Sequence, residues 1–188
     1  PKALESLSVR LRLALGHAPT PGQQRAIVAL ERLVDSPREQ ATLVLKGYAG
    51  TGKTTLVGAL VKVLTKARIP VVLLAPTGRA AKVLAAHSSA SASTIHRRIY
   101  RVGGEDEGVG LTLAPNKDAG ALFIVDEASM IGQGGGDGLF GNRDLLSDLF
   151  QHVFAAPNCK LLLIGDPAQL PPVGSDHSPA LDLKDLRG

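Results

Sequence analysis

The sequence of 188 residues is poor in cysteine and aromatic residues, with one cysteine, no tryptophan, two tyrosines and four phenylalanines. A single thiol, Cys159, forms no disulfide within the chain, which excludes a secreted scaffold stabilised by disulfides. So few aromatic rings argue against a base-stacking sheet that reads single-stranded RNA. No Cys or His residues have the spacing of zinc ligands.

Long apolar segments are missing as well. No apolar run reaches the roughly 18 residues that a membrane span needs. The first residues lack the basic, apolar and small-residue order of a signal peptide, so we expect a cytoplasmic protein without a membrane segment. A content of 44% hydrophobic and 20% charged residues excludes a disordered chain, and the length suits one domain.

Acidic residues are absent between Gln40 and Gly104, a stretch that contains ten Lys and Arg. Residues 1–100 hold 15 Lys and Arg against 4 Asp and Glu, whereas residues 101–188 hold 6 against 13. This asymmetry indicates an anionic partner for one half of the chain or, equally, a solvated basic face.

Hydrophobic patterning predicts an α/β fold in which a parallel sheet is flanked by helices. Continuous apolar runs, typical of strands buried on both faces, occupy residues 41–45, 70–75, 121–125 and 160–164. Helical patterns cover residues 2–15, 22–34, 53–66, 78–86 and 143–154. The alternation of strand and helix begins after the first two helices, so we expect an N-terminal helical extension, 1–36, before the main domain, 37–188.

Two segments interrupt this alternation. Residues 101–120 contain Gly103-Gly104 and an acidic triplet, and we expect a small excursion such as a hairpin there. Residues 132–141 carry six glycines in ten positions, which predicts a mobile loop.

The segment Gly47–Thr54, GYAGTGKT, has the spacing of a phosphate-binding P-loop and lies between an expected strand and an expected helix, the context that this motif requires. Its glycines let the backbone approach phosphates, whose charge the loop amides and the helix N-terminus then face. Lys53 is expected near the β- and γ-phosphates, and the Thr54 hydroxyl is expected to bind Mg²⁺. The residues expected to contact the nucleotide are Gly47, Gly50, Thr51, Gly52, Lys53, Thr54 and Thr55.

Two further strand ends carry polar residues. Asp126 and Glu127 follow the apolar run 121–125, and acids there are costly unless they face a cation or a cleft. We expect Asp126 to anchor Mg²⁺ and Glu127 to deprotonate the attacking water. Gln169 follows the run 160–164 and is placed to sense a γ-phosphate, although a plain proline-rich exit loop is an equally good interpretation.

Taken in order, five motifs resemble the first motor domain of superfamily 1 DNA helicases, in the RecD-like branch that includes Dda-type phage helicases and relaxase-helicases. They are GYAGTGKT, APTGRAAKVL (75–84), STIHR (93–97), DEASM (126–130) and GDPAQLPPVG (165–174). The resemblance runs from about Thr20 to Gly174. It implies a RecA-like P-loop ATPase that uses ATP and Mg²⁺ and translocates on single-stranded DNA.

The resemblance also implies residue roles. Gln23 resembles the adenine-recognising glutamine, Lys53, Glu127 and Gln169 resemble catalytic residues, and Thr54 and Asp126 resemble the magnesium ligands. Two groups resemble DNA-contacting motifs, namely Pro76, Thr77 and Arg79, and Thr94, His96 and Arg97. Segment 101–120 occupies the place of the strand-separating pin. Independently of the family, Arg79, Lys82, Arg97, Arg98 and Arg101 form a candidate phosphate track.

These helicases use two RecA-like domains, and no second one fits in the chain after residue 174. We therefore expect a longer chain or a partner to supply it, and we expect a monomer. A P-loop kinase of small molecules is the alternative enzyme, although a water-activating pair such as Asp126-Glu127 argues against it. A non-catalytic, nucleotide-gated binding module that acts with a partner is a further alternative.

Overall fold

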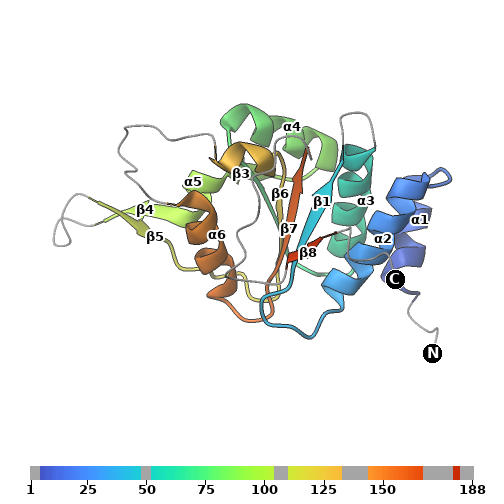
Figure 1. Cartoon of the computed structure of the whole chain (residues 1–188), viewed down its shortest axis with the longest axis horizontal. Coiled ribbons are helices and arrows are strands. Elements are labelled where there is room, and N and C mark those ends of the chain that lie inside the picture. Colours follow the sequence, from blue (N-terminus) through green and yellow to red (C-terminus); the bar gives the residue numbers. More distant parts are fainter. Residues whose placement is uncertain (1–4, 48–51, 104–109, 133–143, 167–179, 183–188) are drawn as a thin grey trace.

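The computed structural model describes residues 5–47, 52–103, 110–132, 144–166 and 180–182. Figure 1 shows a twisted main sheet with helices on both sides and a two-stranded ribbon, β4 and β5, at the left. In chain order the elements are α1 (Leu7–Leu15), α2 (Pro21–Val34), β1 (Thr42–Lys46), α3 (Lys53–Lys66), β2 (Val71–Ala75), α4 (Gly78–Ser88), β3 (Ala92–Thr94), α5 (Ile95–Ile99), β4 (Tyr100–Val102), β5 (Leu111–Leu113), β6 (Leu122–Val125), the 3₁₀ helix η1 (Ala128–Gly132), α6 (Leu145–Phe154), β7 (Lys160–Gly165) and β8 (Ala180–Asp182).

The main sheet has six strands in the order β3-β2-β6-β7-β1-β8, and every neighbouring pair is parallel. The four strands expected from the apolar runs are β1, β2, β6 and β7, so the predicted α/β fold with a parallel sheet is confirmed. The sequence did not predict β3 and β8, because three residues at a sheet edge give no apolar run.

Alternate residues of the central strands enter two separate cores, which explains why those strands contain continuous apolar runs. In β6, Leu122 and Ile124 pack with α1, α2 and α3, whereas Phe123 and Val125 pack with α5 and α6. All four side chains are at most 2% exposed. The N-terminal helices α1 and α2 therefore share one core with the P-loop helix α3.

Helix ends follow local capping rules. The expected helix at 2–15 was too long, because Ser6 caps α1 by accepting a hydrogen bond from the Val9 N–H and the helix begins at Leu7. Thr20 caps α2, and Pro21 is its first residue, one position before the expected start at residue 22. Helix α3 spans the predicted residues, and α4 runs two residues further than predicted.

The two irregular segments are partly described. Strands β4 and β5 pair antiparallel, which confirms the excursion expected at 101–120, and residues 104–109 between them lie outside the described residues. Of the glycine-rich run 132–141, only Gly132 is described, at the end of η1. Among the described residues, no helix has both the length and the apolar character to cross a membrane.

Candidate nucleotide and DNA site

A cleft of about 610 Å³ opens at the carboxyl ends of the central strands, where ligands bind in open α/β sheets. Strand β7 lies between β1 and β6, so the segments that follow these three strands meet at one edge. Lys53 and Thr54 from the start of α3, and Asp126 and Glu127 from the end of β6, line this cleft together. The structure thus joins two motifs that are more than 70 residues apart in the sequence.

The described end of the P-loop is set by Gly52, which has a φ of +80° and caps the N-terminus of α3. The Lys53 ammonium donates a hydrogen bond to the carbonyl of Gly47, so the loop holds its own lysine. The Gly47 N–H in turn donates to the Gly165 carbonyl at 3.2 Å, which joins the ends of β1 and β7. Gly50 and Thr51 lie outside the described residues, and Thr55 is exposed on the neighbouring face of α3.

Gln23 is 5% exposed, and both the oxygen and the nitrogen of its side-chain amide form hydrogen bonds with backbone groups. The Gln23 Oε1 accepts from the Thr20 N–H at 3.1 Å, which completes a capping box at the start of α2. Its Nε2 donates to the Gly52 carbonyl at 3.3 Å. Sequence reasoning missed this second contact: Gln23 connects α2 to the phosphate loop.

The acidic pair follows β6 through a tight turn. The Asp126 N–H donates to the Leu74 carbonyl at 3.0 Å, and its Oδ1 accepts from the Glu127 N–H at 2.9 Å. Asp126 is half-buried, whereas Glu127 is exposed and has a φ of +52°. That backbone conformation costs a non-glycine residue about 1–2 kcal/mol, and such strain gathers at functional sites. The turn holds Glu127 at the mouth of the cleft.

The cleft contains three groups that sequence reasoning did not assign. Asp166 follows β7 and lines the cleft beside the acidic pair. An acid directly after a buried strand was the available signal, the same one that identified Asp126. His87 and Ser88, at the end of α4, also line the cleft, and the buried Ser88 hydroxyl has no hydrogen-bond partner within the described structure. Gln169 lies outside the described residues.

The two candidate DNA motifs follow adjacent parallel strands. Ala75 of β2 pairs in register with Thr94 of β3, so Pro76 and Thr77 begin next to Thr94. Thr77 Oγ1 caps α4 by accepting from the Ala80 N–H at 3.2 Å. Thr94 Oγ1 caps α5 through the Arg97 N–H, also at 3.2 Å. Each hydroxyl retains its own proton for a phosphate oxygen.

Of the charged residues in these motifs, Arg79 and Arg97 are exposed. His96 is half-buried, with its ring 5.8 Å from that of Tyr100. Burial lowers the pKa of His96, which favours the neutral ring at pH 7. His96 therefore brings little positive charge to this motif at pH 7.

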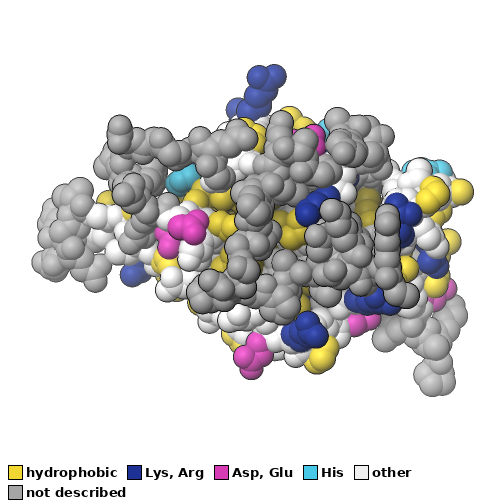
Figure 2. Space-filling model, in the orientation of Figure 1, with side chains coloured by type: hydrophobic (Ala, Val, Ile, Leu, Met, Phe, Trp, Pro, Cys, Tyr) yellow, Lys and Arg dark blue, Asp and Glu magenta, His cyan; other side chains and the backbone are white. Residues whose placement is uncertain are grey.

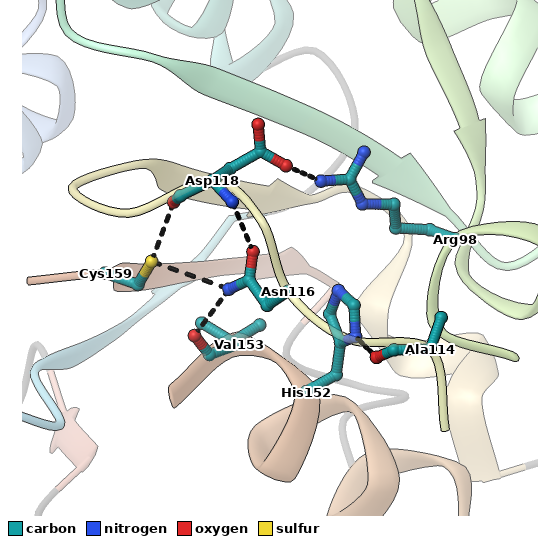
Figure 3. Close-up of polar contacts among 7 residues, drawn as sticks. All are labelled: Arg98, Ala114, Asn116, Asp118, His152, Val153 and Cys159. Atoms are coloured by element: carbon teal, nitrogen blue, oxygen red, sulfur yellow. Dashed lines mark hydrogen bonds and ion pairs between the residues drawn. The ribbon is translucent and has the colours of Figure 1, made fainter. Parts of the chain in front are cut away.

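The structure removes Arg98 from the candidate phosphate track. Its guanidinium forms an ion pair with Asp118 (Figure 3). It also lies over the ring of Phe123, 5.7 Å from the centroid. Arg98 directly follows the exposed Arg97 in the short helix α5. The sequence alone does not show which of the two side chains is held by another part of the protein. Arg101 remains exposed on β4, with its Nε donating to Thr112 across the hairpin at 3.2 Å.

The Arg98 ion pair belongs to a polar network that links the segment between β5 and β6, residues 114–121, to α6 and to the start of β7 (Figure 3). Asn116 Nδ2 donates to the Val153 carbonyl at 2.9 Å, and the Cys159 thiol donates to the Asp118 carbonyl at 3.1 Å. His152 is 2% exposed, with Nδ1 bound to the Ala114 carbonyl at 2.8 Å. Burial lowers the pKa of His152. These groups are structural.

Comparison with known proteins identifies relatives of this chain. A family model described as an AAA domain matches residues 19–183. The ATP-dependent RecD2 DNA helicase of Deinococcus radiodurans is 37% identical over 134 residues, which cover 70% of this chain and 16% of that protein. The ATP-dependent DNA helicase dda of Enterobacteria phage T4 is 31% identical over 162 residues, which cover 82% of this chain and 33% of that protein. The matched part of the chain thus spans about a sixth of the length of the Deinococcus helicase and about a third of the length of the phage helicase.

Proposed function

The chain belongs to the AAA domain family, as a RecD-like superfamily 1 helicase motor domain, and we propose that it binds and hydrolyses ATP to drive translocation on single-stranded DNA. The observation that carries this proposal is the cleft in which Lys53 and Thr54 face Asp126 and Glu127. A second RecA-like domain, from a longer chain or a partner, completes the motor.

The donor set of the cleft fits a magnesium nucleotide. The Thr54 hydroxyl and the carboxylates of Asp126 and Asp166 are the hard oxygen ligands that Mg²⁺ prefers, and the Lys53 ammonium complements phosphate charge. When bound, Mg²⁺ neutralises charge on the phosphate oxygens. In this proposal Lys53 leaves the Gly47 carbonyl for the phosphates, and Gln169 senses the γ-phosphate.

Glu127 is the proposed general base. Its exposed carboxylate stands at the mouth of the cleft, within reach of a water that enters from solvent. Accepting the proton of that water as it attacks is the role of a positioned carboxylate, and such catalysis typically contributes about 10²–10⁴-fold in rate. The hydrogen bond from the Asp126 N–H to the Leu74 carbonyl fixes the turn that carries this group.

Two substitutions test the site. Lys53→Ala is expected to abolish Mg-ATP binding, measured by calorimetry, because no other lysine or arginine lines the cleft among the described residues. Glu127→Gln is expected to keep binding while lowering phosphate release by about 10²-fold or more. Unchanged nucleotide binding by Lys53→Ala would show that the site assignment is wrong. Transfer of phosphate to a small acceptor would favour a kinase.

The DNA part of the proposal rests on the paired strand ends, which present Thr77, Arg79, Thr94 and Arg97 on one edge. Side-chain hydroxyls and guanidinium groups bind phosphates without reading sequence. We expect binding of dT20 with a steep salt dependence and little sequence preference. A strong preference for one sequence at equal salt would contradict this.

A further inference from the structure

The helices α1, α3 and α4 contain no Asp or Glu, although together they carry seven Lys and Arg. Helix α1 packs along α3, and α4 packs on its other side. In Figure 2, basic and hydrophobic side chains lie next to each other over α1, at the right of the view. A surface that combines positive charge with exposed apolar groups differs from an ordinary solvated face.

Between α1 and α3 this surface is hollowed. A depression of about 270 Å³ is lined by Arg10, Leu13 and Ala14 of α1 and by Lys62, Val63 and Lys66 of α3. The Leu13 side chain is 69% exposed at its rim. A second depression of about 320 Å³ shares Ala14 and Lys62 with the first and continues to Thr55 and His87. We call the two together the basic–apolar groove.

The floor of the basic–apolar groove is one face of α3. Thr55, Gly58, Ala59, Lys62, Val63 and Lys66 recur at the helical spacing of i, i+3, i+4, i+7, i+8 and i+11. At a rise of 1.5 Å per residue the groove is about 17 Å long, room for about three turns of another helix. At Gly58 an added Cβ would lie 3.0 Å from the His87 carbonyl oxygen, so α4 already packs closely at this end of the floor.

Within the part of the chain that the structure describes, the cations of the groove have no side-chain partners. Among the described residues, Arg10, Lys62 and Lys66 form neither ion pairs nor side-chain hydrogen bonds, and the Arg10 Nε is shielded from solvent with its N–H unsatisfied. Leaving a buried charged donor without an acceptor costs about 1–3 kcal/mol or more. A carboxylate brought to this position would satisfy that N–H and neutralise the surrounding charge.

We propose that the basic–apolar groove binds an acidic amphipathic helix of a partner protein. Leu13 and Ala14 on the α1 side and Val63 on the α3 side contact a stripe of leucine-like side chains, and the three cations pair with carboxylates on either side of that stripe. Single-stranded DNA fits less well, because among the described residues no Phe, Tyr or Trp lines the groove and the one ring there able to stack on a base is that of His87, at one end. The mode is helix-in-groove recognition.

The test uses two labelled, acetylated peptides of 15 residues, one with leucine at helical spacing and glutamate on both borders, the other with glutamine in place of each glutamate. Fluorescence anisotropy at low salt is expected to show the glutamate peptide binding at least tenfold more tightly. Leu13→Asp, and Lys62→Gln combined with Lys66→Gln, are each expected to weaken binding more than tenfold. These side chains are exposed, so the fold persists, which circular dichroism checks.

Matched controls are Val102→Asp, at a side chain 75% exposed on the hairpin, and the exposed Lys117→Gln. Both are expected to bind the glutamate peptide like the parent. The proposal is overturned if both peptides bind equally, if neither binds, or if the groove variants bind like the parent. Binding of dT20 or of anionic lipid vesicles that is lost in the same groove variants would assign the groove to nucleic acid or membrane instead, which also overturns it.

Discussion

Replacing Gly52 by alanine perturbs the junction between the phosphate loop and α2 in two separable ways. A Cβ at Gly52 would lie 2.4 Å from Nε2 and 3.2 Å from Cδ of Gln23. Gln23 must then move, which breaks its hydrogen bonds to Gly52 and Thr20, each contributing about 1 kcal/mol. The φ of +80° adds about 1–2 kcal/mol of backbone strain for any residue with a Cβ. We expect Gly52→Ala to lower the free energy of unfolding by about 3–4 kcal/mol in total.

A double-mutant cycle separates the two effects. In a Gln23→Ala background only the backbone strain remains, so Gly52→Ala should cost about 1–2 kcal/mol, and the coupling between the sites is about 2 kcal/mol. Urea unfolding without nucleotide, followed by circular dichroism, measures each corner. Gly16→Ala is the matched control, because Gly16 has a φ of +73° and a Cβ there meets nothing within 4 Å. Equal costs of Gly52→Ala in both backgrounds would refute the reasoning.

Three further outcomes follow from the described contacts. Arg97→Ala is expected to weaken dT20 binding and reduce its salt slope by about 1, whereas Arg98→Ala leaves both unchanged because Asp118 holds that guanidinium; equal slopes in a salt titration would contradict this. Ser89→Gly is expected to raise the free energy of unfolding by about 0.5–1 kcal/mol, measured in urea, since Ser89 ends α4 with a φ of +50°. Burial lowers the pKa of His152 below its unfolded value, so its contribution to the free energy of unfolding is fully present above about pH 6.5 and is lost as the pH falls below that value. His152→Leu should therefore reduce the difference between the free energies of unfolding measured at pH 7.5 and at pH 5.

The sequence predicts the centre of the fold well because the physics there is local. Strands β1, β2, β6 and β7 are largely buried on both faces, so apart from Thr42 and the terminal Lys46 and Lys160 their side chains are apolar, and each run is visible without knowledge of its neighbours. The edge strand β3 and the short helix α5 depend on pairing with β2 and on the Thr94 cap. Three to five residues carry too little pattern to reveal such contacts.

In the candidate site too, the sequence predicts the positions of the motif residues but not the partners of their side chains. The positions of Lys53 and Asp126 follow from a motif or a strand end, and parallel pairing brings them to one edge of the sheet. The partner of Gln23 lies 29 residues away, and that of Arg98 lies 20 residues away. Nothing in the local sequence distinguishes Arg98 from its exposed neighbour Arg97. Side-chain partners across elements are decided by packing, which spacing alone does not encode.

Thr77 and Thr94 hold their side chains in fixed rotamers before any ligand arrives, because each hydroxyl oxygen already accepts the N–H of a helix. A free surface side chain loses rotamer entropy when a ligand immobilises it, at a cost of about 0.5–1.5 kcal/mol. Here that ordering occurs when α4 and α5 fold. For a nucleic-acid strand whose phosphates contact these two hydroxyls, the protein surface is therefore preorganised, and most of the conformational entropy lost on binding is that of the strand.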